Sequence, residues 1–148
     1  MRRLLSRRKE RGATIAEMSI AGIALCLALF GVIEFGRLLF TQNALTDAVR
    51  RGARFAVINK KDVDAVQNIT IYGVNPPGGA VPLVAGLQKS NVSVVYTSDF
   101  GIKQGSVTVK ITGFQFSFVV PLIGATINMG EFKTTLTAES SGELPPVM

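Results

Sequence analysis

The stretch that decides the fold is ATIAEMSIAGIALCLALFGVI, residues 13–33, in which Glu17 is the only charged residue. About 20 apolar residues suffice for a helix to cross the hydrocarbon core of a bilayer. The stretch therefore predicts a transmembrane helix. A carboxylate is costly to bury in lipid, so Glu17 calls for a functional reason.

The residues before this stretch, 1–12, form a basic leader. The leader carries six Lys or Arg side chains against the single Glu10, a net charge of +5, whereas residues 13–148 carry ten against nine, a net charge of +1. Because the body of the chain has no basic excess, we expect no nucleic-acid partner. Positive charge beside a first apolar helix stays in the cytoplasm, which predicts a cytoplasmic N-terminus and an extracytoplasmic C-terminal domain.

A removed secretory signal peptide is the alternative interpretation of this N-terminus. A signal peptide needs a cleavage site with small residues and a break soon after the apolar stretch. The helical pattern instead continues through residues 34–38 without a proline, which favours a retained anchor. The lone cysteine, Cys26, lies within the apolar stretch and is expected to be a small residue facing lipid or another helix.

The helical pattern runs on to about residue 57, with apolar and charged residues on different faces. A helix over residues 13–57 would be roughly 65–70 Å long. Small residues recur at every fourth position of its second half: Ala44, Ala48, Gly52 and Ala56. Such a ridge lets another element approach the backbone closely. Packing against the protein's own sheet is favoured over a subunit interface.

Beyond the helix, the hydrophobic period changes to that of strands. We expect strands at residues 68–72, 91–96, 106–112 and 132–139, with the alternation of the third continuing to Phe118. They predict an α+β fold in which the long N-terminal helix, its first half transmembrane, packs on a small antiparallel β-sheet of about four strands.

The predicted segments are the leader 1–12, the transmembrane half-helix 13–33, the amphipathic half-helix 34–58, a β-rich domain 59–140 and a flexible tail 141–148. Residues 119–124 form an unusually apolar connection between strands. This connection is expected either to be buried under the sheet or to meet lipid or a partner.

Residue types that carry common chemistry are scarce. The chain has no histidine, the commonest general base and metal ligand. No glycine-rich phosphate-binding motif precedes a helix. Asp62 and Asp64 lie in a polar connection and are expected to be solvated. The sequence therefore predicts no catalytic residue, no metal site and no cofactor.

Four stretches carry a resemblance to a known family: RGATIAEM (residues 11–18), FGVIEFGRLLF (30–40), NALTDA (43–48) and RRGARFA (50–56). With them the chain resembles type IV pilin-like proteins, and more closely the TadE-like pseudopilins of tight-adherence (Flp) pilus systems. The family motif residues are Glu34, Phe35, Gly36, Arg37, Arg50, Gly52 and Arg54. The chain departs from the family at Met18, where an aromatic residue is usual, and at Arg51, where an acidic one is common.

The resemblance implies a pilin-like fold and a minor pseudopilin of the bacterial inner membrane, with a periplasmic domain. It implies that a prepilin peptidase cuts between Gly12 and Ala13 and frees an amine that Glu17 can pair with. The implied partners are that peptidase, other pilins or pseudopilins, the inner-membrane assembly platform and the lipid bilayer. Pairing of Glu17 with Arg11 is the alternative role for this carboxylate.

Three other functions are weighed against this one. The first is an uncleaved, single-pass, signal-anchored envelope scaffold with a periplasmic binding domain. The second is an envelope enzyme that uses Asp62, Asp64 and Asp99. The third is a major fibre subunit, although Flp-type major pilins are much shorter than this chain, which favours a minor component.

Overall fold

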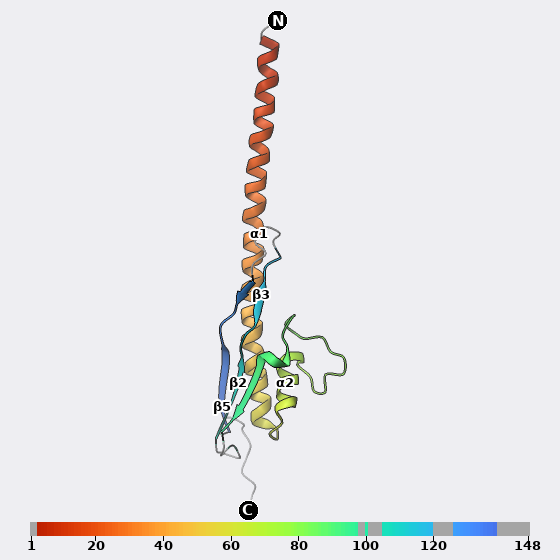
Figure 1. Ribbon diagram of the computed structural model, residues 1–148, viewed down its shortest axis with the longest axis vertical. Coiled ribbons are helices and arrows are strands. Elements are labelled where there is room, and N and C mark those ends of the chain that lie inside the picture. Colours follow the sequence, from red (N-terminus) through yellow and green to blue (C-terminus); the bar gives the residue numbers. More distant parts are fainter. Residues whose placement is uncertain (1–2, 98–99, 101–104, 120–125, 139–148) are drawn as a thin grey trace, which may run out of the picture.

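A single helix dominates the structure, a computed structural model that describes residues 3–97, 100, 105–119 and 126–138, with side chains from residue 12 onward. This helix, α1, spans Arg3–Ile58. Its 56 residues extend over about 84 Å at the standard rise. The long N-terminal helix is confirmed, and it begins earlier than predicted, since the leader continues it. A small α+β domain packs on its C-terminal half (Figure 1).

The N-terminal half of α1 stands apart from the domain. All residues from 12 to 33, Cys26 included, are exposed within the chain. Among the described residues, α1 is the one helix long and apolar enough to cross a membrane, and only 6% of its apolar window is buried. This long apolar helix suggests a single-pass membrane anchor.

A second helix, α2 (Val63–Tyr72), lies where the sequence predicts the first strand. The prediction of a strand at residues 68–72 is therefore wrong. Asp62 caps its first turn, where the carboxylate accepts a hydrogen bond of 3.0 Å from the Ala65 N–H. Gly73 ends it in the left-handed conformation, with φ of 77°. These caps satisfy the helix ends. Packing against α1 then outweighs the strand preference of the β-branched residues.

The five strands of the described residues form two antiparallel sheets, whereas the sequence predicts one sheet of about four strands. The larger sheet has the order β1-β2-β5, and β3 pairs with β4 in the smaller. Gly113, with φ of 68°, breaks the expected continuation of the third predicted strand into β3. The bounds are β1 Val92–Tyr96, β2 Ser106–Ile111, β3 Gln115–Ser117, β4 Thr126–Asn128 and β5 Phe132–Thr137, with a 3-10 turn, η1, at Lys89–Asn91.

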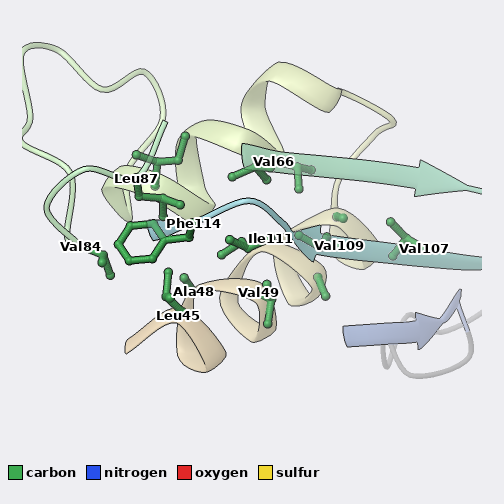
Figure 2. Close-up of a cluster of buried hydrophobic side chains, with 14 of the residues drawn as sticks. Leu45, Ala48, Val49, Val66, Val84, Leu87, Val107, Val109, Ile111 and Phe114 are labelled. Atoms are coloured by element: carbon green, nitrogen blue, oxygen red, sulfur yellow. The ribbon is translucent and has the colours of Figure 1, made fainter. Parts of the chain in front are cut away.

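The core lies between α1, α2 and the larger sheet (Figure 2). The alternation predicted for β2 is confirmed, because Val107, Val109 and Ile111 are fully buried. Burying a side chain of this size contributes about 1.5–3 kcal/mol. Leu45 and Val49 of α1 are also fully buried and belong to the same cluster.

The ridge of small residues on α1 faces this core. Ala48 and Ala56 are buried and Ala44 is partly buried against the cluster. At Gly52 a side chain would collide with Thr70 Oγ1 of α2 and lie 3.5 Å from Val109 Cγ1 of β2. The ridge therefore lets α1, α2 and β2 meet at one point.

Part of what the sequence singles out lies outside the described residues. This applies to Asp99, to residues 120–124 of the apolar connection and to the tail 141–148. Val119, the first residue of that connection, is described and is 71% exposed.

We expect Gly52→Ala to loosen the domain and the matched change Gly36→Ala to leave it intact. Thr70 is fully buried and its hydroxyl donates to the Val66 carbonyl at 2.7 Å, so it cannot easily move away from a new methyl group. Such overpacking costs about 1–3 kcal/mol, whereas a side chain at Gly36 meets nothing within 4 Å in the described part of the chain. Amide hydrogen exchange of α2 and β2 in the detergent-solubilised chain measures the difference.

Thr70→Ala combined with Gly52→Ala tests the cause. Removal of the hydroxyl should make the cost of the added methyl group smaller, with a coupling energy within about 0.5–3 kcal/mol. Equal exchange in the Gly52→Ala and Gly36→Ala chains would contradict the close approach.

Candidate functional site

The predicted cleavage junction lies within the continuous backbone of α1. Gly12 and Ala13 are exposed, and a side chain at Gly12 would meet none of the described side chains within 4 Å. Glu17 is also exposed and stands four residues after Ala13, so the two residues share one face of the helix. Among the described side chains Glu17 has no ion-pair partner, and the side chain of Arg11, its alternative partner, is outside them.

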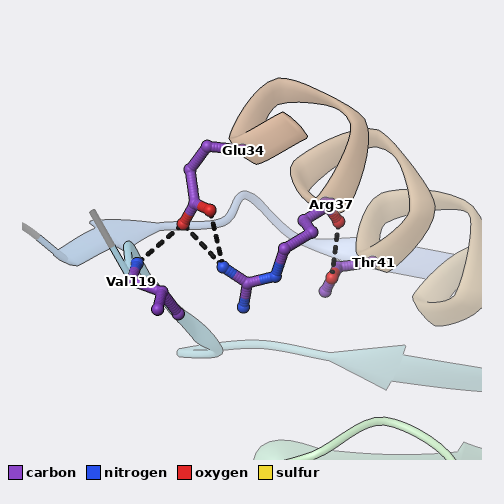
Figure 3. Close-up of polar contacts among 4 residues, drawn as sticks. All are labelled: Glu34, Arg37, Thr41 and Val119. Atoms are coloured by element: carbon purple, nitrogen blue, oxygen red, sulfur yellow. Dashed lines mark hydrogen bonds and ion pairs between the residues drawn. The ribbon is translucent and has the colours of Figure 1, made fainter. Parts of the chain in front are cut away.

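A second polar site lies on α1 at Glu34, one residue after the predicted transmembrane half. Glu34 is only 5% exposed. Its two carboxylate oxygens accept hydrogen bonds from Arg37 Nη1 at 2.6 and 2.7 Å, and one of them also accepts the backbone N–H of Val119 at 2.8 Å (Figure 3). We call these three residues the Glu34 cluster.

The helix and the smaller sheet together position the Glu34 cluster. Glu34 and Arg37 are three residues apart and therefore neighbours on the helix surface. The Arg37 guanidinium lies 5.3 Å from the centroid of the Phe116 ring in β3. Thr41 donates its hydroxyl to the Arg37 carbonyl at 2.9 Å. A buried carboxylate needs such compensation, because a charge left unpaired in a protein interior is strongly destabilising.

The contacts also give the direction of the chain that leads to Val119. Val109 lies beside Gly52, Phe116 beside Arg37 and Val119 beside Glu34. The numbers rise along the sheet as they fall along α1. The chain through β2 and β3 therefore runs towards the N-terminal, apolar half of the helix, as Figure 1 shows.

The other motif residues do not join this cluster. Phe35, Gly36 and Arg54 are exposed. Arg50 forms a loose ion pair of 3.8 Å with Asp47, both on the surface. Gly52 is the buried contact point of α1 described above. Only Glu34 and Arg37 of the predicted motif are brought together as a polar site.

Arg51, one of the two departures from the family pattern, has a structural role. Its Nε donates to the Ile69 carbonyl at 3.1 Å and its Nη2 donates to the Thr70 carbonyl at 3.3 Å. The Thr70 carbonyl lies in the last turn of α2, where carbonyls lack partners within the helix, and the Ile69 carbonyl also accepts the Gly73 N–H at 3.0 Å. Arg51 therefore ties the end of α2 to α1, which the sequence did not indicate.

Sequence reasoning also missed the contact between Glu34 and Val119. A signal existed for one part of the cluster, since Arg37 follows Glu34 at a spacing that favours an ion pair. No local pattern marks Val119, whose backbone N–H makes the contact and which lies 85 residues further along the chain.

We expect Glu34→Ala to release the chain at Val119. A hydrogen bond to a charged group contributes about 1.5–3 kcal/mol. Its loss should speed exchange of the Val119 amide by at least about tenfold, since 1.4 kcal/mol is a factor of ten. Amide exchange followed by NMR measures this rate.

Glu34→Gln should give a smaller acceleration, because its amide oxygen can still accept the Val119 N–H. Asp47→Asn is the matched control, since it removes an exposed ion pair of the same spacing. An unchanged rate in the Glu34→Ala chain would contradict a role for this carboxylate in holding Val119.

Comparisons with known proteins give a match, and it lies on α1. The family model described as TadE-like protein matches residues 12–54, from Gly12 through the Glu34 cluster on α1 to Arg54. Neither the curated proteins nor the solved structures contain a match to the chain. The match confirms the predicted resemblance of this chain to the TadE-like family over the part of α1 that carries the motifs.

Proposed function

We propose that the chain is a minor pseudopilin that is anchored in the bacterial inner membrane and acts in the assembly of a tight-adherence (Flp) pilus or secretion system. The TadE-like match supports a role associated with such pili. The observation that carries the proposal is the apolar half of α1, which the described part of the domain leaves uncovered. Such a helix needs lipid or other apolar helices around it. A pilin-like subunit moves between these two environments.

The proposal includes a cut by a prepilin peptidase between Gly12 and Ala13. The open space around Gly12 supports it, because no described side chain of the domain lies near the junction. Glycine also lowers helix stability by about 1 kcal/mol, which makes local unwinding for the peptidase easier. The cut would remove the leader with its net charge of +5 and create an amine at Ala13.

Glu17 acquires its role after this cut. Its carboxylate would stand one helical turn from the new amine and would pair with it or with the amine of a neighbouring subunit. An unpaired charge within a membrane-spanning helix costs about 2.5–3.5 kcal/mol on the insertion scale. The pair would therefore favour one register between subunits.

We propose a structural role rather than an enzymatic one for the domain. Its two described candidate acids have other partners: Asp62 caps α2, and Asp64 forms a surface ion pair of 2.8 Å with Lys89. The partners of this structural role would be other pilins or pseudopilins and the inner-membrane assembly platform.

The proposed cut predicts a mature chain that begins at Ala13. Mass spectrometry and N-terminal sequencing of the membrane-purified protein should find this terminus in cells that have the peptidase and the intact leader in cells that lack it. Gly12→Leu should abolish the cut, because its side chain enlarges the residue at the junction.

Gly22→Leu is the matched control, since Gly22 lies in the same open helix and should leave cleavage unchanged. An intact leader in cells with an active peptidase would contradict the proposal and favour the uncleaved, signal-anchored scaffold.

We expect Glu17→Gln to be cut and anchored normally but to assemble poorly, because it cannot pair with an amine. Crosslinking of the mature chain to neighbouring pilins should fall by about tenfold or more, the factor that corresponds to 1.4 kcal/mol. Ser19→Ala is the control, since the Ser19 hydroxyl donates to the Ile15 carbonyl of its own helix at 2.9 Å. Equal crosslinking in the two variants would rule out a pairing role.

A further inference from the structure

We propose that the β3–β4 hairpin rests on the membrane surface, so that the chain touches the bilayer at a second place beside its transmembrane helix. The described residues that would meet lipid are Val119, which follows β3, and Ile127 in β4. The proposal depends on the membrane anchor of the proposed function and not on cleavage of the leader.

The Glu34 cluster fixes the level of the hairpin along α1. Residues 13–33 extend over about 31 Å, close to the thickness of the hydrocarbon core of about 30 Å. Glu34, the next residue, therefore lies at the boundary between hydrocarbon and headgroups. The hydrogen bond of 2.8 Å from the Val119 N–H to Glu34 brings the end of β3 to the same level.

The hairpin is uncharged near this level and exposes two large apolar side chains, beside the exposed polar residues Gln115, Ser117, Thr126 and Asn128. Val119 is 71% exposed, and Ile127 is also exposed. Residues 111–130 contain no charged residue. The charges that flank them, Lys110 and Glu131, pair with each other at 3.5 Å near the larger sheet. Charge is thus kept away from the end of the domain that faces the anchor.

The helix also exposes large apolar side chains as far along its axis as the level of the hairpin. Large exposed apolar side chains run along the described part of α1 from Ile15 to Phe40, and the next one is Ile58. The exposed apolar surface therefore continues past residue 33 to the part of α1 that the hairpin accompanies. Two elements that expose apolar side chains at one level indicate a common apolar surrounding.

The polar groups at this level suit the headgroup region. Arg37 keeps 44% of its side chain exposed while it pairs with Glu34. Elements that lie on a membrane bury apolar side chains about 5–10 Å into the boundary between headgroups and acyl chains and keep cationic ones at the surface. Val119 and Arg37 would occupy these two positions.

The absence of tryptophan from the sequence provides the test, because a single introduced tryptophan reports on its own surroundings. Val119→Trp in the full chain, reconstituted in phosphatidylcholine vesicles, should be quenched by nitroxide-labelled lipid. Aqueous acrylamide should quench it severalfold less than the control Val95→Trp.

Val95 is a matched control position because it is 52% exposed and lies on β1, opposite Thr108. The neighbouring Val109 packs beside Gly52. That point is about 27 Å further along α1 than Glu34. Val95→Trp should therefore respond to acrylamide and not to labelled lipid.

Phe30→Trp reports on the anchor itself. If labelled lipid quenches Phe30→Trp while Val119→Trp behaves like Val95→Trp, the proposed contact of the hairpin with lipid is refuted and the proposed membrane anchor is supported. If labelled lipid quenches neither Phe30→Trp nor Val119→Trp, the membrane anchor fails too. Protection of Val119→Trp from both quenchers that disappears as the protein is diluted in lipid would also overturn the proposal, since a second copy would then cover the hairpin.

Discussion

The contact between Gly52 and Thr70 sets how closely α1 and α2 approach, and the rest of the domain depends on that approach. Val109 of β2 reaches the same point, so two helices and the central strand of the larger sheet meet there. Thr70 cannot easily withdraw, because it is buried and its hydroxyl bonds within α2. The position of β2 on α1 follows, and with it the line along which the chain continues to β3.

The two halves of α1 have different surroundings, the core of the domain for one and the exterior of the domain for the other. The C-terminal half presents small and branched residues to the core, and Ala48, Val49 and Ala56 are buried there. The N-terminal half presents apolar side chains that the other described residues do not cover. Glu34 lies between the two halves, where a carboxylate can reach both its helical neighbour Arg37 and the backbone of the domain.

The periodicity of the sequence predicted correctly those elements whose two faces differ most in burial. The alternation of β2 reflects one buried and one more exposed face, and the length of the apolar stretch identified α1. The error at α2 came from its β-branched residues, Ile69, Thr70 and Ile71. The signals that would have corrected it were present in the sequence, since Asp62 can cap a helix start and Gly73 a helix end.

The Glu34 cluster, too, could be predicted from the sequence only in part. The ion pair of Glu34 with Arg37 is local, so its spacing could have been recognised. The hydrogen bond from Val119 depends on where the two sheets place a backbone N–H. No sequence pattern around Glu34 or around Val119 predicts it. The break at Gly113 that separates β2 from β3 is also set by the backbone and was hidden by an apparently continuous alternation.

The continuity of α1 also has a mechanical consequence. The strands lie roughly along the helix axis (Figure 1), and buried contacts with the domain are spread along α1 from Leu45 to Val57. A force applied along the axis, as when a subunit is drawn out of a membrane, loads these contacts in shear, so that they must yield together. A sideways force would separate them one after another. The domain therefore resists a force along the axis of α1 better than a force across it.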